Sequence, residues 1–437
     1  MRKMQKKAKK DCHIYQMLKT NAKKRRVSFH TPGHKRTKWD ITELSYSDNL
    51  AAPSGCIQHA EKDIAKILGA SKSFLLTDGS TAGIFSMLYA AKAQGVNTLL
   101  ILGAAHKSVQ NACVILGIVP LFAAQKAQNG IPLPFFSQVL VEEYQNEFSA
   151  CEGVLVTSPD YYGNIPDLAE IARICKSANK LFLIDGAHGG HLHFHRDLYA
   201  GTYADLWVDG VHKSLPALTQ GAVVSAKTDA LAEKLYEGVN VFRTTSPSYP
   251  IMASVEYAVK YPQNKKLERF TTEFEKSSER IYFGGDWTKL CARFGAHAFK
   301  VQSRLEKEGI FPEFCNGNVI LFYLSPATKL HKFRALKRKL LRLFAEYPLN
   351  ENTLQNDVQQ IPAPLVSTKT TEKEWVDLEK SAGRICAADC GLFPPCTPLI
   401  RAGERVAKEN IDLLKKAANV YGVKDGRILV LKTESEE

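Results

Sequence analysis

A lysine and an aspartate each follow an apolar run of this sequence, 28 residues apart. Asp185 ends the run 181–184, and Lys213 follows the run 205–208 in a region poor in charge. A lysine among apolar neighbours and other cations has a lowered pKa and becomes a nucleophilic amine, as Schiff-base chemistry requires. A carboxylate at a strand end needs a cationic partner, and a protonated pyridine nitrogen is one. Asp185 could also simply cap the next turn.

The segment 77–83, TDGSTAG, follows an apolar run and precedes a helical pattern. Backbone N–H groups at the start of a helix, together with hydroxyl side chains, bind phosphate groups. Ser80 and Thr81 are the candidate phosphate ligands. For an isolated match, a serine or threonine that only caps the helix is an equally good interpretation.

The elements that must position these residues follow from the apolar pattern. Short apolar runs occur at 73–77, 97–102, 118–122, 153–157, 180–184, 205–208 and 222–225. Helical patterns separate them, as at 81–93 and 167–178. Continuous apolar strands alternating with helices indicate a mostly parallel sheet covered on both faces. The sequence therefore predicts an α/β domain whose sheet has seven strands.

The remainder of the chain suggests two further parts. Composition becomes polar after about residue 260, and another strand pattern appears only at 318–324. The segment 329–342 places Leu330, Phe333, Leu336, Leu340 and Leu341 at helical spacing, which predicts a surface helix that packs this stripe inward. We expect a basic N-terminal arm and segment over 1–55, a large domain over 56–280, and a smaller α+β domain over 281–437.

The net charge of +13 comes mainly from residues 1–26, which hold eleven Lys or Arg and one acid. We interpret these residues as a solvated, partly helical arm, with neither a nucleic-acid nor a membrane partner. The arm lacks the apolar stretch of a secretory signal, and no apolar run approaches the ~18 residues of a membrane span. The ten cysteines contain no CxxC pair. We expect a cytoplasmic protein with reduced thiols and no metal.

Taken together, these motifs resemble the bacterial Orn/Lys/Arg decarboxylase family in its short form, a group of fold-type I enzymes that depend on pyridoxal 5'-phosphate. The resemblance extends over residues 28 to 405. It rests on FHTPGHK at 29–35, FLLTDGST at 74–81, HKS at 106–108, TSPDYYG at 157–163, DGAHGGHL at 185–192, HKSLPALTQ at 212–220 and TTSPSY at 244–249, and weakly on PPCTP at 394–398 and GE at 403–404.

The resemblance implies a role for each matching position. Lys213 would hold the cofactor covalently and Asp185 would pair with its ring nitrogen, while His106 would stack on the ring and His188 would line the pocket. The cofactor-binding set would also include Ser80, Thr81 and His212. Family members close each site across a dimer interface, which here assigns Thr245 and Ser246 to the neighbouring subunit's cofactor. A homodimer or higher homo-oligomer with shared active sites follows.

The expected reaction is decarboxylation of arginine, lysine or ornithine to a polyamine-pathway amine. His188 or Lys213 would supply the proton that replaces the carboxyl group. Several positions depart from the family pattern: Gly186 stands where a Glu is usual, Gly210 where a phosphate-binding Ser is usual, and Cys396 where a Gly is usual. Arg401 and Ala402 also replace a Pro-Gly pair. Glu404 and Asp48 are candidates for binding a basic substrate.

Three alternatives remain open from the sequence. The same cofactor also supports transamination, elimination and aldol cleavage. A metal enzyme is possible because His188, His191, His193 and His195 lie close together, and the last three alternate as they would on one face of a strand. A non-catalytic binding protein is the third alternative, because Gly186 and Gly210 depart from the family pattern.

Overall fold

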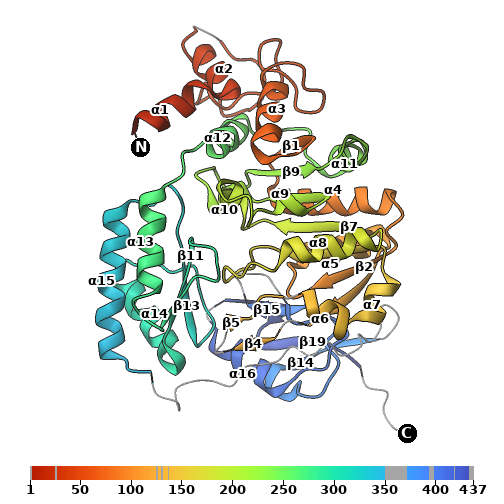
Figure 1. Cartoon of the computed structure of the whole chain (residues 1–437), viewed down its shortest axis with the longest axis vertical. Helices are drawn as coiled ribbons and strands as arrows, with labels where there is room; N and C mark the ends of the chain where they lie inside the picture. The colour runs from red at the N-terminus through yellow and green to blue at the C-terminus, as the bar shows by residue number, and fades with distance from the viewer. Residues whose placement is uncertain are drawn as a thin grey trace.

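The computed structural model describes residues 2–24, 27–124, 126–128, 131–135, 137–349, 372–392, 398–417 and 419–432. Its centre is a seven-stranded sheet in the order β1-β9-β8-β7-β6-β2-β3 (Figure 1). The strands are β1 Lys72–Leu76, β2 Thr98–Leu102, β3 Val119–Ala123, β6 Gly153–Thr157, β7 Leu181–Gly186, β8 Leu206–Asp209 and β9 Ala222–Ala226. Only β9 runs antiparallel to its neighbours in this sheet. The seven apolar runs thus form one mostly parallel sheet, as predicted.

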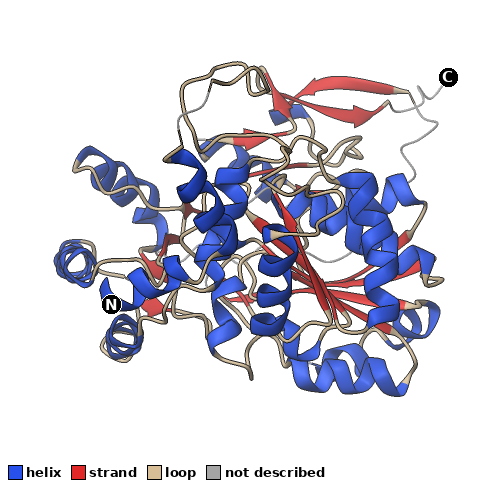
Figure 2. Ribbon diagram, turned by 90° about the horizontal axis from the view of Figure 1, so that it is seen from above, coloured by secondary structure: helices blue, strands red, loops and turns tan. Residues whose placement is uncertain are grey.

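Helices cover both faces of this sheet (Figure 2). Leu183 points into the core with α4, α5 and α11, whereas Ile184 points into the core with α3, α8 and α12. Because both faces are buried, the strands are apolar throughout instead of alternating. The helices are α3 Cys56–Leu68, α4 Gly79–Ala93, α5 Lys107–Leu116, α8 Leu168–Ser177, α11 Asp229–Phe242 and α12 Tyr249–Val259. Shorter elements here are β4 Ala127–Gln128, β5 Ile131–Pro132, α6 Ser137–Glu142, α7 Gln145–Ala150, α9 Ala200–Tyr203 and α10 Val211–Ser214.

A second, antiparallel sheet follows in the order β10-β11-β13-β12. Its strands are β10 Ile281–Tyr282, β11 Lys289–Arg293, β12 Phe314–Cys315 and β13 Val319–Tyr323, and its helices are α13 Lys265–Glu275, α14 Ala298–Lys307 and α15 Leu330–Glu346. On α15 the buried residues are Phe333, Leu340 and Leu343. The prediction that Leu341 belongs to the inward stripe is wrong, because Leu341 is 42% exposed.

The C-terminal strands pack on the other face of this second sheet. They form two three-stranded sheets, in the orders β14-β19-β18 and β16-β15-β17. Their buried residues share a core with Cys291 of β11 and Leu321 of β13. The elements are β14 Lys373–Asp377, β15 Cys390–Leu392, β16 Pro398–Ile400, α16 Lys408–Lys416, β17 Val420–Tyr421, β18 Val423–Lys424 and β19 Arg427–Leu431. The predicted division at residues 55 and 280 stays a prediction.

The N-terminal arm is not solvated throughout, which corrects the prediction. Helix α1, Arg2–Lys10, carries basic residues, but the next helix α2, His13–Ala22, buries Ile14 and Leu18 completely in the core of the large sheet. An apolar stripe at i and i+4 explains this docking. The high density of Lys and Arg around it hid that stripe in the sequence.

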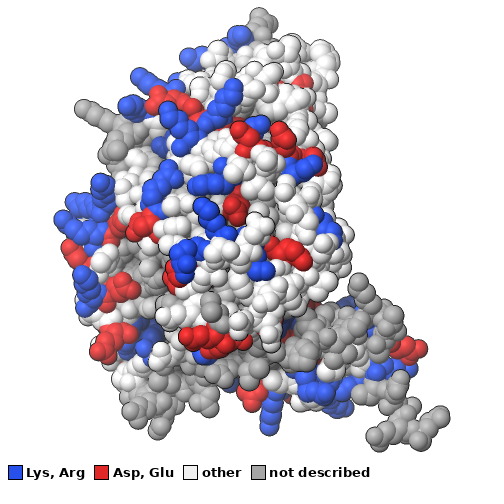
Figure 3. Space-filling view, turned by 45° about the vertical axis from the view of Figure 1, so that its right-hand side comes forward, with Lys and Arg blue, Asp and Glu red and all other residues white. Residues whose placement is uncertain are grey.

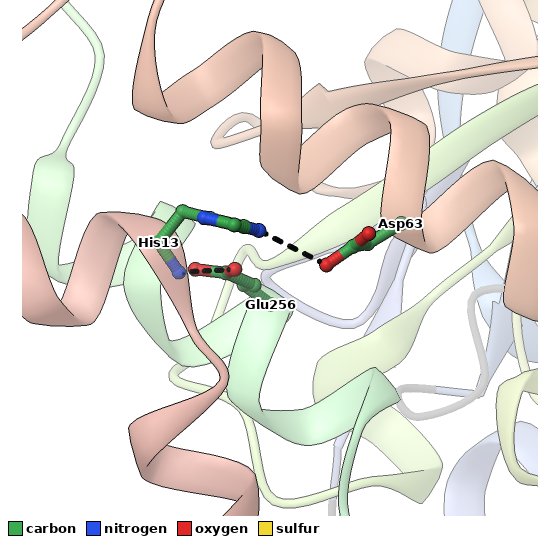
Figure 4. A group of neighbouring side chains, drawn as sticks. All are labelled: His13, Asp63 and Glu256. Atoms are coloured by element: carbon green, nitrogen blue, oxygen red, sulfur yellow. Dashed lines mark hydrogen bonds and ion pairs between the residues drawn. The ribbon is translucent and has the colours of Figure 1, made fainter.

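Glu256 of α12 fastens α2 to the large sheet (Figure 4). Its fully buried carboxylate accepts hydrogen bonds from the backbone N–H groups of His13 at 2.6 Å and Ile14 at 2.9 Å. A carboxylate at a helix N-terminus is stabilised by these donors and by the helix dipole. The Lys260 ammonium contacts both Glu256, at 3.1 Å, and Asp63, at 2.6 Å, and the imidazole of His13 also binds Asp63.

Positive and negative side chains are interspersed over the face of the molecule shown in Figure 3. Within the described residues, no helix is both long and apolar enough to cross a membrane.

Candidate active site

Two neighbouring parallel strands bring the predicted aspartate and lysine to one edge of the large sheet. In the register of β7 and β8, Asp185 lies beside Val208 and Gly186 beside Asp209. Lys213 follows on the short helix α10, directly after β8. The carboxyl ends of parallel strands are where open α/β sheets bind ligands. Lys213 Nζ lies 3.2 Å from Nε2 of His188, in the turn after β7.

Asp185 is buried at the end of β7, with only 2% of its surface exposed. Its Oδ1 accepts a hydrogen bond from the Ala187 N–H at 3.1 Å. Burial raises the pKa of Asp185, and the charge of Lys213 acts in the opposite direction. A buried carboxylate in this position is stabilised by a further cation. A protonated ring nitrogen satisfies that requirement.

His106 is the N-cap residue of α5 and is influenced by the charges of Lys213 and Lys107. Its Nδ1 accepts from the Ser108 backbone N–H at 3.2 Å. Burial lowers the pKa of His106 to about 4, and the charges of Lys213 and Lys107 add to this effect. The imidazole is therefore neutral near pH 7 and can pack on an aromatic ring without adding charge.

The predicted phosphate ligands lie in the first turn of α4, where backbone N–H groups have no intrahelical acceptor. Ser80 is half-buried and Thr81 is exposed. Nearby, the hydroxyl of Thr77 is buried without a hydrogen-bond partner among the described residues. Unpaired donors of this kind, at a helix N-terminus, fit a phosphate group.

Three loops meet at this helix start. The Gly79 N–H donates to the carbonyl of Gln220, and both the backbone N–H and the ring Nδ1 of His212 bond to the carbonyl of Gly221. These contacts place His212 beside the start of α4, and its role in binding the cofactor stays a prediction. The side chain of Asp78 accepts from the Thr244 N–H at 3.1 Å.

Thr245 and Ser246 follow that anchored residue and are exposed. The contact between Thr244 and Asp78 therefore holds the segment 244–246 at the start of α4 within a single chain. Whether the two exposed hydroxyl side chains reach a neighbouring subunit stays a prediction.

Two of the glycines that depart from the family pattern lie where the backbone leaves no room. A Cβ at Gly210 would lie 2.4 Å from the carbonyl oxygen of Ala187, and one at Gly186 would lie 2.8 Å from that of Val208. At Gly210 the backbone before α10 thus approaches the turn after β7, and at Gly186 the end of β7 approaches β8, more closely than a side chain allows. Cys396 lies outside the described residues.

The two acidic candidates for substrate binding already have backbone or ionic partners. Glu404 binds the guanidinium of Arg401, with Oε1 2.6 Å from Nε. Asp48 accepts four backbone N–H bonds, including those of Gly55 and Ile57 at the start of α3. Burial acts to raise the pKa of Asp48, but these bonds together outweigh it and lower the pKa. Both carboxylates hold loops in place, so neither is available as a free recognition group.

The alternating histidines do not share one face of a strand, which corrects the basis of the metal alternative. The chain leaves β7 at Gly186, and residues Gly190–Phe194 form a 3-10 helix. The three side chains bind three different partners: His191 contacts Asp286 at 2.8 Å, His193 contacts the Gly190 carbonyl at 2.7 Å, and His195 contacts Glu268 at 2.6 Å. They do not converge on one point.

Among the described residues, one group of side chains lies close enough together to hold a metal ion: His13, Asp63 and Glu256. The ammonium of Lys260 already lies between its two carboxylates. These side chains therefore already have partners, and the contacts they make hold α2 against the large sheet.

Burial of His193 predicts that acid destabilises this fold. Its pKa is lowered to about 4, mainly by burial. In the unfolded chain the pKa of histidine is about 6.5, so the unfolded state binds more protons between these values and the free energy of unfolding falls as pH drops from 6.5 to 4. The loss from this residue is about 3 kcal/mol. In denaturant titrations across this range, His193→Gln should flatten the slope, while His331→Gln on the exposed start of α15 should not. Equal slopes in all three proteins would refute the assignment.

Residues that the sequence did not single out surround His188. Its Nδ1 lies 3.2 Å from the hydroxyl of Tyr323, and its ring packs edge-on against Tyr161, with centroids 5.3 Å apart. The fully buried ammonium of Lys289 lies 4.3 Å from the centroid of the Tyr323 ring. Lys289 and Tyr323 lie in none of the motifs quoted from the sequence, and Tyr161 lies in the motif at 157–163 but was given no role there. No local signal therefore identified them as neighbours of His188.

Comparison with known proteins agrees with this geometry. The family model described as "Orn/Lys/Arg decarboxylase, major domain" matches residues 36–281. The chain is 28% identical to the Bacillus subtilis protein named uncharacterized protein YaaO, over 97% of this chain and 99% of that protein. It is 26% identical to a B. subtilis arginine decarboxylase, over 97% and 98% of the two chains.

The fold also resembles a solved structure, that of the constitutive lysine decarboxylase of Escherichia coli. The TM-score is 0.76 with 20% identity, covering 96% of this chain and 82% of that one. The predicted fold-type I architecture is confirmed, and the buried Asp185, the Lys213 amine and the start of α4 fit pyridoxal phosphate. The chain belongs to the Orn/Lys/Arg decarboxylase family, whose members are pyridoxal-phosphate-dependent amino acid decarboxylases.

Proposed function

We propose that this protein decarboxylates a basic amino acid, arginine, lysine or ornithine, to the corresponding polyamine-pathway amine. The observation that carries the proposal is the convergence of Lys213, His188 and Asp185 at the carboxyl ends of β7 and β8. Arginine is the first substrate to test, because an arginine decarboxylase matches this chain over nearly the full length of both proteins.

When bound, pyridoxal phosphate supplies a ring that accepts the electron pair released as carbon dioxide leaves. The protein's own residues provide position and charge. Asp185 would stabilise a proton on the ring nitrogen, and Lys213 would hold the cofactor and offer its amine as a proton source. His188 keeps that amine in place through the 3.2 Å contact with Nζ. By orienting the bound substrate, these residues would favour loss of its carboxyl group over loss of the α-proton.

We also propose a homodimer in which Thr245 and Ser246 face the partner's cofactor. In support, both residues are exposed, while the neighbouring Thr244 is anchored at the phosphate end of the site. Sedimentation of the purified protein tests this, since an active monomer would contradict it.

The experiment that tests the function is carbon dioxide release by the cofactor-loaded protein from L-arginine, L-lysine and L-ornithine, with the amine products identified by mass. We expect release from one member of the panel. Bound cofactor without release from any of the three would overturn the proposed reaction in favour of another reaction of the same cofactor.

A further inference from the structure

The imidazole of His188 is held at both of its nitrogens. Nε2 faces the Lys213 amine at 3.2 Å, and Nδ1 faces the Tyr323 hydroxyl at 3.2 Å. The side chain is buried, with 8% exposed. A neutral imidazole carries one proton, so one nitrogen donates and the other accepts. Which nitrogen carries the proton determines whether His188 can act on Lys213 as an acceptor or as a donor.

The surroundings of Tyr323 decide between these two tautomers. Its hydroxyl has one proton and lies 3.1 Å from the backbone carbonyl of Tyr161, which can only accept. The hydroxyl therefore donates to that carbonyl and has only lone pairs to offer His188. The matching donor is Nδ1–H of His188, which leaves the lone pair of Nε2 directed at Lys213.

Burial and the neighbouring ammonium groups keep the ring neutral. Burial lowers the pKa of His188 well below its usual value, and the charges of Lys213 and Lys289, with His106 and His212 also facing the ring, act in the same direction. Lys289 is held in place by contacts with Asp286 Oδ2 at 3.4 Å and with the Thr288 hydroxyl at 3.1 Å. A second proton on His188 would lie in a buried site beside the ammonium groups of Lys213 and Lys289.

We propose that Tyr323 is a positioning residue that holds His188 in the Nδ1–H tautomer, so that Nε2 accepts a hydrogen bond from the Lys213 amine. His188 then orients the amine, and Lys213 alone carries the proton to be delivered. This inference rests on the proposed function for its consequence in catalysis, but the tautomer itself is a property of the cofactor-free chain.

The test is nitrogen NMR of cofactor-free protein labelled with ¹⁵N-histidine. Loss of one pair of signals in His188→Gln identifies the residue. We expect a protonated, pyrrole-type Nδ1 and an unprotonated, pyridine-type Nε2 in the wild type. In Tyr323→Phe, which keeps the ring over Lys289, the Nδ1–H form should lose its dominance. Tyr162→Phe is the matched control, because the Tyr162 hydroxyl contacts Asn316 rather than His188.

A wild-type His188 protonated at Nε2, or at both nitrogens near neutral pH, would overturn the proposal even if a variant failed to fold. An unchanged His188 spectrum in Tyr323→Phe would overturn the role of the hydroxyl. In the loaded enzyme we expect kcat of Tyr323→Phe to fall about tenfold with little change in KM, since the hydroxyl acts on proton transfer rather than on substrate binding. The NMR result does not depend on which substrate is decarboxylated, so the two proposals can fail separately.

Discussion

Lys213→Ala should abolish covalent attachment of pyridoxal phosphate and lower kcat on the order of 10⁴-fold, because the variant loses both the nucleophile and the proton source. Lys213 is half-buried, and its Nζ is positioned by His188. Borohydride reduction of the loaded protein followed by peptide mass mapping gives the direct measurement. The label should appear on the peptide that contains residue 213.

Lys227→Ala is the matched control for that experiment. Lys227 is an exposed lysine whose ammonium binds the carbonyl of Gly201, away from the site. Its variant should keep the label on Lys213. A label that persists in Lys213→Ala, or decarboxylation that survives there, would remove the central residue from the proposed site.

Asp185→Asn should lower kcat on the order of 10³-fold while the protein stays folded, because the ring nitrogen loses the negative charge that keeps it protonated. Asparagine has nearly the same shape as aspartate and can still accept the bond from Ala187. Burial already disfavours the charged form of Asp185, as its raised pKa indicates. We therefore expect the melting temperature of the cofactor-free variant to be unchanged or higher.

Asp205→Asn separates this electrostatic effect from a general effect of losing a carboxylate. Asp205 lies just before β8, at the opposite end of the sheet, where it accepts from the Phe182 N–H at 2.8 Å. It should change stability without a comparable loss in kcat. If Asp185→Asn decarboxylates as fast as the wild type, Asp185 does not pair with the ring nitrogen.

The seven strands of the large sheet could be predicted because strands buried on both faces are apolar throughout. Leu183 and Ile184, for example, are consecutive apolar residues that are buried in different cores, on opposite faces of the sheet. The spacing of the histidines after β7, in contrast, led to a wrong prediction. His191, His193 and His195 alternate like residues of a strand, yet the chain has already left β7 and turned into a 3-10 helix.

The basic composition of residues 1–26 led to the wrong prediction that this arm is solvated throughout, because its few apolar residues stand among many Lys and Arg. Ile14 and Leu18 are flanked by basic residues, yet both are completely buried in the core of the large sheet. In the same way, Asp48 and Glu404 are acidic side chains whose partners lie close to them in the chain, and neither could be judged without coordinates.

The sequence by itself determined the sheet, the strand-end aspartate, the lysine after the next strand and the family, because each depends on residues within a few positions of one another. Only the tertiary structure decided what surrounds His188. Tyr323 is 135 residues away in the chain and Lys289 is 101 residues away. Hydrogen bonds between such segments form when two sheets pack together, and this packing leaves no periodicity in the sequence. The protonation of His188 is therefore a property of the assembled fold.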